Sequence, residues 1–175
     1  MVEGSSTAAW KDVTVSMNSF GYRRGASVFV SVSSEITWNM KTTFTANALT
    51  AGGVMYAVSS TIGWMGEETA FSINNALHHG GAIMMGNVLS LCWNGETGFI
   101  INTAGGAADA VHALNSFDVY WPGKATFVNN LLYVGGAVMV ESLSVVSWDG
   151  ETVFSSNTAT YSGGAVNVFD GSTAS

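Results

Sequence analysis

The stretch "WMGEETAFSINNALHHGGAI", residues 64–83, places a tryptophan, a phenylalanine, two asparagines and a glycine pair close together. Its landmarks are Trp64, Phe71, Asn74 and Gly80-Gly81. Similar stretches precede and follow it, and a tryptophan marks each of them, at positions 10, 38, 64, 93, 121 and 148. The mean spacing is about 28 residues, and a fixed period of this length is the signature of a repeat architecture.

The other landmarks keep step with the tryptophans. Five to seven residues after each Trp comes an apolar residue: Val15, Phe44, Phe71, Phe99, Phe127 and Phe154. Three residues later comes an asparagine: Asn18, Asn47, Asn74, Asn102, Asn130 and Asn157. A glycine pair then follows at Gly52-Gly53, Gly80-Gly81, Gly105-Gly106, Gly135-Gly136 and Gly163-Gly164, with Arg24-Gly25 as a degenerate first copy. The six copies predict rungs near 10–37, 38–63, 64–92, 93–120, 121–147 and 148–175.

The segments between these landmarks alternate between apolar and polar residues with period two, which is typical of β-strands. In "GGAVMVES", for example, Val138 and Val140 share one face and Met139 lies on the other. Three short strands and three bends per copy would return the chain to its starting point one rung higher, about 4.8 Å away. The sequence therefore predicts one all-β domain over residues 1–175, a parallel β-helix of about six rungs with three strands in each. A propeller blade would need four strands and a longer repeat.

In such a coil, equivalent residues stack on one another. We expect the phenylalanines to stack in the core and the asparagines to bond both to the bend backbone and to one another. A further series, three residues before each phenylalanine position, faces outward: Asp12, Lys41, Glu68, Glu96, Lys124 and Glu151. Unlike neighbours in this series should attract weakly, whereas Glu68 next to Glu96 should repel weakly.

Composition limits the classes of partner. The chain has 175 residues, a net charge of −7 and only five basic residues, which argues against nucleic-acid binding. A neutral partner, such as a glycan, a protein surface or another copy of this chain, fits better.

Cys92 is the single cysteine, so no disulfide can form within the chain. We find no apolar run long enough to span a bilayer and no secretion signal, and we therefore expect either a cytosolic protein or a piece of a longer one.

The repeat resembles a known family. "TAFSINNALHHGGAIM" (residues 69–84) and "TVFSSNTATYSGGAVNV" (residues 152–168) are similar to the repeat of the polymorphic outer membrane proteins, in which FxxN is followed closely by GGA and an aliphatic residue. The resemblance extends over the whole chain. It implies a right-handed β-helix that serves as a surface-exposed passenger or adhesin, is secreted, and is normally followed by a membrane barrel. It thus implies an extracellular or cell-surface location.

The histidines and the cysteine are weak candidates for a site. A metal site needs three or four converging ligands, and the bends that correspond to His78-His79 in other copies carry no His, Cys or carboxylate. We therefore predict that His78-His79 form a solvated loop and that His112 lies on the surface. Cys92 precedes Trp93 with no histidine in register, which argues against a nucleophile.

The carboxylates leave one alternative open. Parallel β-helices also host polysaccharide lyases and hydrolases, and Glu67-Glu68 with Glu96 and Lys124 could form an acid/base group. Because Glu recurs at the same place in several copies, we interpret these residues as a structural surface. Asp109 and Asp118 break the repeat and are the least explained acids. We thus predict no catalytic, cofactor-binding or metal-binding residues and a non-enzymatic binding rod, with a polysaccharide-acting enzyme and a self-assembling rod as the alternatives.

Overall fold

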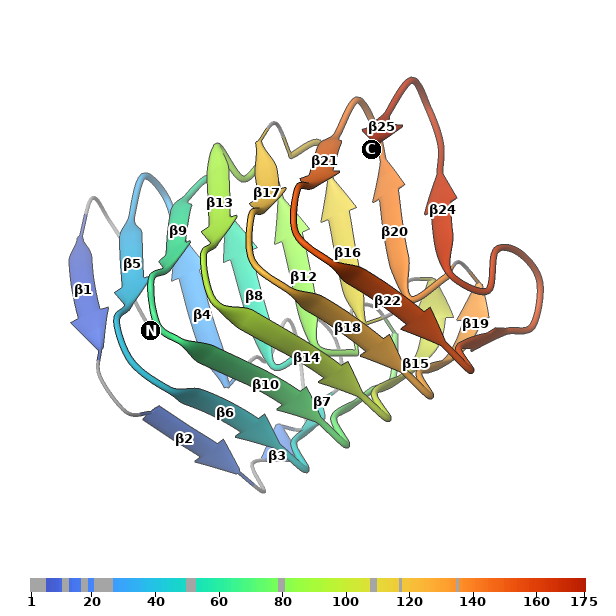
Figure 1. The fold of residues 1–175 in the computed structure, drawn as a ribbon, viewed down its shortest axis with the longest axis horizontal. Coiled ribbons are helices and arrows are strands. Elements are labelled where there is room, and N and C mark those ends of the chain that lie inside the picture. The colour runs from blue at the N-terminus through green and yellow to red at the C-terminus, as the bar shows by residue number, and fades with distance from the viewer. Residues whose placement is uncertain are drawn as a thin grey trace.

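The computed structural model describes residues 6–10, 13–16, 19–20, 27–49, 53–78, 81–107, 110–116, 118–134 and 136–175. These residues form 25 short strands and no helix. The paired strands run parallel, and each pairs with strands about 28 residues before and after it in the chain. Figure 1 shows the resulting stack, which runs from the N-terminal strands at the left to the C-terminal strands at the right. The chain is therefore a parallel β-helix, as predicted.

Four sheets form its walls. Sheet 1 contains β1 (Thr7–Trp10), β5 (Glu35–Trp38), β9 (Thr61–Trp64), β13 (Ser90–Trp93), β17 (Val119–Trp121), β21 (Val145–Trp148) and β25 (Thr173–Ala174). Sheet 2 contains β2 (Val13–Ser16), β6 (Thr42–Thr45), β10 (Glu68–Ser72), β14 (Glu96–Ile100), β18 (Ala125–Val128) and β22 (Thr152–Ser155). Together they carry the tryptophan and phenylalanine landmarks.

The other two walls complete each rung. Sheet 3 contains β3 (Ser19–Phe20), β7 (Ala48–Leu49), β11 (Asn75–Ala76), β15 (Thr103–Ala107), β19 (Leu131–Val134) and β23 (Thr158–Ala159). Sheet 4 contains β4 (Val28–Ser31), β8 (Met55–Val58), β12 (Ile83–Gly86), β16 (Val111–Leu114), β20 (Val138–Glu141) and β24 (Val166–Val168). Sheet 4 consists of a two-stranded part (β4 and β8) and a four-stranded part. Backbone hydrogen bonds join the two parts, from Met55 N to the Ala82 carbonyl and from Ser59 N to the Gly86 carbonyl.

The number of strands per rung differs from the prediction. Each rung has four strands, one in each sheet, instead of three. The additional strand belongs to sheet 3 and is often only two residues long, as in β7, β11 and β23. A pair of residues is too short to show an alternating pattern, so the sequence reads this wall as part of a bend.

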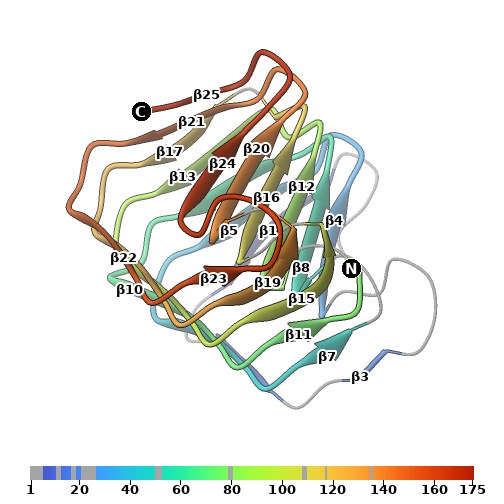
Figure 2. The same ribbon diagram turned by 90° about the vertical axis from the view of Figure 1, so that its right-hand side faces the viewer.

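The predicted number of rungs is close to the observed one. From the first to the last strand of sheets 2 and 3 the chain makes five full turns. In Figure 2, which views the C-terminal end, the chain runs anticlockwise from β20 through β21 and β22 to β23 as it approaches the viewer. The coil is therefore right-handed, the sense that the twist of strands favours for crossovers between parallel strands.

Stacked aromatic rings fill the interior. Trp38, Trp64, Trp93 and Trp121 lie flat on one another with ring centroids 4.3–4.5 Å apart. The phenylalanines from Phe44 to Phe154 form a second stack with spacings of 4.7–5.1 Å. Five tryptophans have a buried indole N–H group with no hydrogen-bond partner among the described residues: Trp38, Trp64, Trp93, Trp121 and Trp148. Ring stacking and burial, rather than hydrogen bonds, therefore hold the tryptophan series in place.

The asparagines form the predicted ladder. Asn74 is fully buried, and its Nδ2 donates to Asn102 Oδ1 at 2.9 Å and to the Phe44 carbonyl at 3.1 Å. Its Oδ1 accepts from the backbone N of Asn47 at 3.2 Å and from Asn47 Nδ2 at 2.9 Å. The Asn102, Asn130 and Asn157 side chains repeat this arrangement. Each asparagine thus satisfies the backbone of a bend that is out of reach of water; Asn18 lies outside the described residues.

The residue before each asparagine makes the bend between sheets 2 and 3. It has a left-handed backbone, with φ between 53° and 56°, at Ala46, Ile73, Ile101, Asn129 and Ser156. This region is unfavourable for side chains branched at Cβ, such as isoleucine, and is tolerated by asparagine. The helix therefore carries some backbone strain at Ile73 and Ile101.

This strain yields a prediction. Replacing Ile101 by Asn should stabilise the protein by about 0.5–1 kcal/mol, because Ile101 is 47% exposed and Asn129 already occupies the same position one rung later. Equilibrium urea unfolding of wild type and variant measures the gain. The matched control is Ile100→Asn, which sits in strand β14 at 38% exposure and should bring no gain. Equal effects of the two substitutions would refute the strain argument.

A second polar ladder was not predicted. Ser34, Ser60, Ser116 and Ser144 are buried where sheet 4 turns into sheet 1. The backbone N of Ser116 donates to Ser144 Oγ at 2.9 Å, and that of Ser144 donates to Ser172 Oγ at 3.0 Å. Val88 takes this place in the third rung and interrupts the ladder. Serine recurring at a spacing of 26–28 residues, with one copy replaced by Val88, is the sequence signal for this ladder.

One glycine pair was assigned wrongly. In the registers Ile83↔Val111 and Val111↔Val138, Gly81 and Gly136 stand two residues before the paired strand residue, whereas Gly106 stands five residues before it. Asp109 lies outside the described residues. Gly105 and Gly106 lie inside strand β15, where a Cβ atom would come within 2.6 Å of the Leu77 carbonyl oxygen and 2.1 Å of the His78 one. These glycines permit a close approach of two backbones and do not form the bend. The position of Arg24-Gly25 lies outside the described residues.

Candidate functional site

The outward charge series lies along the start of sheet 2. Lys41 Nζ is 2.7 Å from Glu68 Oε2, and Lys124 Nζ is 3.5 Å from Glu151 Oε2. All four side chains are more than 40% exposed. Glu68 pairs in register with Glu96, as expected, so two carboxylates are neighbours between the two ion pairs. Asp12 lies outside the described residues.

This series predicts a salt-dependent stability. Lys124→Glu removes the ion pair with Glu151 and places four carboxylates in succession, at positions 68, 96, 124 and 151. It should therefore lower the melting temperature by a few degrees at low salt. High salt should reduce the difference, because it screens exposed charges. Lys124→Gln removes the ion pair without adding repulsion and should have the smaller effect. Thermal unfolding at two ionic strengths tests this, and a difference insensitive to salt would contradict it.

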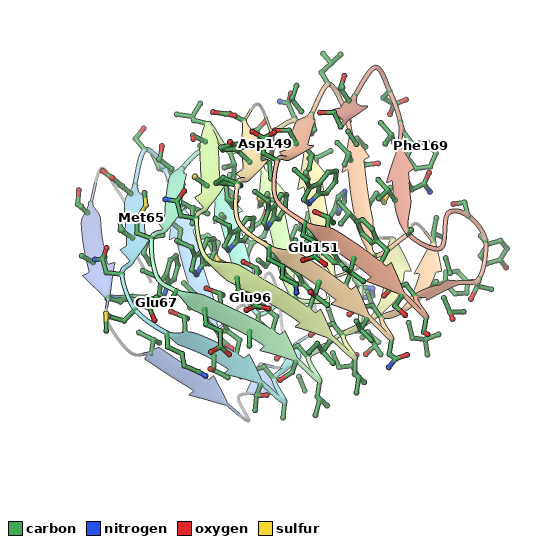
Figure 3. All side chains as sticks on the ribbon, viewed as in Figure 1. Met65, Glu67, Glu96, Asp149, Glu151 and Phe169 are labelled. Atoms are coloured by element: carbon green, nitrogen blue, oxygen red, sulfur yellow. The ribbon has the colours of Figure 1, made fainter. Side chains whose placement is uncertain are left out.

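Two adjoining hollows lie beside these charges. The larger, of about 400 Å³, is lined by Glu68, Ala70, Glu96, Gly98 and Thr126, with Thr69, Thr97 and Ile100. The second, of about 330 Å³, is lined by Met40, Lys41, Glu67, Glu68 and Glu96. The outward positions of Ala70 and Gly98 carry little or no side chain, which makes the wall concave there. Figure 3 shows Glu67, Glu96 and Glu151 along this face.

The structure thus brings Glu67, Glu68 and Glu96 together, as the enzyme alternative requires. These carboxylates are solvent-exposed. A glycosidase-type general acid is instead usually held in an apolar pocket that keeps it protonated. The environment of these groups is that of a solvated charged surface.

The histidines differ from one another. His78 is exposed at the bend after β11, whereas His79 lies outside the described residues. In the described part of the chain no group of three or more His, Cys, Asp or Glu side chains is arranged to hold a metal ion. The prediction that His112 lies on the surface is wrong: it is 3% exposed, and its Nε2 lies 2.8 Å from Glu141 Oε1.

The place of His112 follows from the corrected register. It stands between Met84 and Met139, on the face of sheet 4 that is turned away from Val111 and the core. If Gly105-Gly106 are taken as the bend, the fourth rung is aligned three residues out of register with its neighbours, and His112 no longer matches Met84 and Met139. Glu141 belongs to the next rung, so the histidine and its partner are 29 residues apart in the chain.

Cys92 lies on the outward face of sheet 1. Burial and, secondly, the carboxylate of Asp118 raise the pKa of its thiol. A raised thiol pKa lowers the thiolate fraction and opposes a nucleophilic role. In the same region the Tyr120 hydroxyl donates to Asp149 Oδ2 at 2.8 Å, and this bond raises the pKa of Tyr120.

A third hollow lies on sheet 3 and was not predicted. It measures about 300 Å³ and is lined by Asn75, Thr103, Ala104, Gly105, Leu131, Tyr133 and Thr160. The Tyr133 ring packs edge-on against Tyr161 with centroids 4.9 Å apart, and the Tyr133 hydroxyl donates to that of Tyr161 at 3.2 Å. This bond is the main cause of a raised pKa at Tyr133. The lining residues come from four successive rungs, so they can be recognised as neighbours only when the fourth rung is aligned correctly with the others.

The fold and its surface define a parallel β-helix repeat protein with shallow outer hollows. Comparison of the chain with protein-family models, with curated proteins and with solved structures gave no significant match. No helix capable of crossing a bilayer occurs in the described part of the chain.

Proposed function

We propose that this chain is a non-enzymatic binding module of a cell surface, an adhesin-like rod that presents its outer walls to a partner. One observation carries the proposal: the interior repeats from rung to rung, whereas the outward face of sheet 3 does not. At the core position of sheet 2 the same residue recurs, as Phe44, Phe71, Phe99, Phe127 and Phe154. The outward position of sheet 3 changes at every rung, from Ala48 to Asn75, Thr103, Leu131 and Thr158.

A constant interior with a variable exterior suits recognition. The stacked ladders fix the backbone, so outer side chains can vary without a change of fold, and repeat proteins use such extended walls for binding. Several large apolar side chains are well exposed, among them Leu77 at 59%, Leu131 at 55% and Tyr161 at 68%. The resemblance of the FxxN and GGA motifs to those of the polymorphic outer membrane proteins supports an extracellular location.

A cell-binding assay tests this function. Labelled protein at micromolar concentration should bind saturably to a subset of a broad panel of cell types. A heat-unfolded sample of the same protein is the matched control and should not bind. Absence of saturable binding across the panel, or equal binding by the unfolded sample, would overturn the proposal.

A self-assembling rod, in which copies of the chain stack end to end, is the second candidate. Light scattering against concentration separates the candidates, because end-to-end stacking increases the particle mass whereas a monomeric adhesin keeps it constant.

A further inference from the structure

The hollow on sheet 3 is built by a β-bulge. Strand β15 pairs Ala104 with Leu132 and Ala107 with Val134, so Gly105 and Gly106 together face Tyr133 alone. Two residues opposite one is the defining count of a bulge, and bulges bend a strand and redirect the neighbouring side chains. The hollow therefore results from a specific irregularity of the fourth rung, at a place where the other copies have no glycine pair.

Glycine is required at this bulge. A Cβ atom on Gly105 would lie 2.6 Å from the Leu77 carbonyl oxygen, which is too close for any other residue. Gly105 lines the hollow, so the wall has bare backbone there, next to the Tyr133 ring. The same feature that permits the close approach of β15 to the preceding rung thus leaves room on the outer surface.

The lining combines an aromatic wall with neutral polar groups. Tyr133 is 47% exposed, and its contacts with Tyr161 hold the ring in a defined orientation. Asn75, Thr103 and Thr160 supply amide and hydroxyl groups, which both donate and accept hydrogen bonds. The lining spans four rungs, a length of about 14 Å along the axis at about 4.8 Å per step.

Charge separates this wall from the rest of the molecule. The chain has a net charge of −7, yet no described strand of sheet 3 contains an acidic or basic residue. The hollow on sheet 2, by contrast, is lined by Glu68 and Glu96. A charged ligand would gain no ion pair on sheet 3 and would lose hydration there, so the site favours a neutral ligand.

We infer that the sheet 3 hollow binds a short neutral oligosaccharide, with one sugar ring against Tyr133; this inference rests on the proposed binding function. A sugar ring has an apolar face of C–H groups and a rim of hydroxyls, which matches an aromatic ring beside groups that donate and accept. The volume of about 300 Å³ suits a small ligand, at the lower end of the usual range for such sites. The shallow shape is consistent with weak, reversible contacts that several copies of the protein could reinforce.

The test uses the full chain and a panel of soluble tetrasaccharides. The panel contains neutral hexose and N-acetylhexosamine chains, with sialylated and sulfated chains for comparison. Binding is followed by saturation-transfer NMR and by titration calorimetry. At least one neutral chain should bind, and Tyr133→Ala should weaken its binding about tenfold or more. Tyr120→Ala, which removes a tyrosine from sheet 1, is the matched control and should leave binding unchanged.

Three results would overturn the inference: no neutral chain binds, charged chains bind better than neutral ones, or Tyr133→Ala and Tyr120→Ala behave alike. Circular dichroism of both variants shows whether each keeps its strand content. A Tyr133→Phe variant keeps the ring and should retain most of the binding, which separates stacking from folding. If the protein binds cells but no neutral oligosaccharide, only this site is rejected, because a protein partner would then explain adhesion. If the wild-type protein binds no cells, the proposed function itself is rejected.

Discussion

Asn74→Ala should lower the free energy of unfolding by roughly 2–5 kcal/mol. Asn74 is fully buried, and its Oδ1 accepts from both the backbone N and Nδ2 of Asn47. Removing the amide takes away these two bonds and those that Asn74 Nδ2 donates to Asn102 Oδ1 and to the Phe44 carbonyl. A buried polar group that loses its partner costs about 1–3 kcal/mol. Equilibrium unfolding in guanidinium chloride, followed by tryptophan fluorescence and circular dichroism, measures the loss.

The sequence contains its own control for this experiment. Asn75 is the next residue, is exposed, and faces outward in strand β11. Asn75→Ala should change the free energy by no more than about 0.5 kcal/mol, as is usual for a surface site. The same amino acid at adjacent positions then differs in effect only through its side-chain surroundings. Comparable losses in the two variants would mean that the asparagine ladder does not stabilise the bends.

The sequence predicted those parts of the fold that depend on stacking between rungs. Parallel rungs bring equivalent positions into contact. A side chain that packs or bonds well with a copy of itself therefore recurs at the period of the helix. Trp64, Phe71 and Asn74 meet this condition, and the observed registers join each to its counterparts in the adjacent rungs. The fold class, the two aromatic stacks and the asparagine ladder could therefore be predicted without coordinates.

The parts that the sequence did not reveal are those in which a rung departs from the repeat. The glycines of the fourth rung satisfy a compositional pattern, yet Gly105 and Gly106 serve a close backbone contact instead of a bend. Taking them as a bend shifts the fourth rung by three residues in the alignment of the copies. Neither the His112–Glu141 pair nor the Tyr133 hollow can be recognised from that alignment. A spacing of three residues between Asn102 and Gly105, against five or six in the next rungs, was the available warning.

The candidate site was harder to predict than the fold for a physical reason. Ladder residues are constrained by their neighbours above and below, so they repeat and can be recognised. Outward residues such as Leu131 and Tyr133 are not packed in the core between copies of the same side chain, so they need not recur at the period of the helix. Only the register, which sets Leu131 beside Thr103 and Thr158, shows which of them share a surface.

Phe99→Ala should cost roughly 3–5 kcal/mol of unfolding free energy, through lost burial and the cavity that remains. Phe99 is fully buried and stacks between Phe71 at 5.1 Å and Phe127 at 4.7 Å, with the edge of Trp93 at 6.3 Å. The neighbouring rungs are fixed by their own hydrogen bonds, so they cannot collapse fully into the space. Denaturant unfolding measures the cost, and fluorescence of the folded variant reports the altered surroundings of Trp93.

A graded series gives this prediction its sharpest form. Phe154 belongs to the same stack but has a ring neighbour on one side only and is half-buried, while Phe169 is 39% exposed. The loss on replacement by alanine should fall in the order Phe99, Phe154, Phe169, because the buried area and the number of ring contacts fall in that order. A cost at Phe99 no larger than that at Phe154 would mean that a second stacking neighbour adds nothing. The stability of each rung would then be local instead of depending on contact with the rungs on both sides.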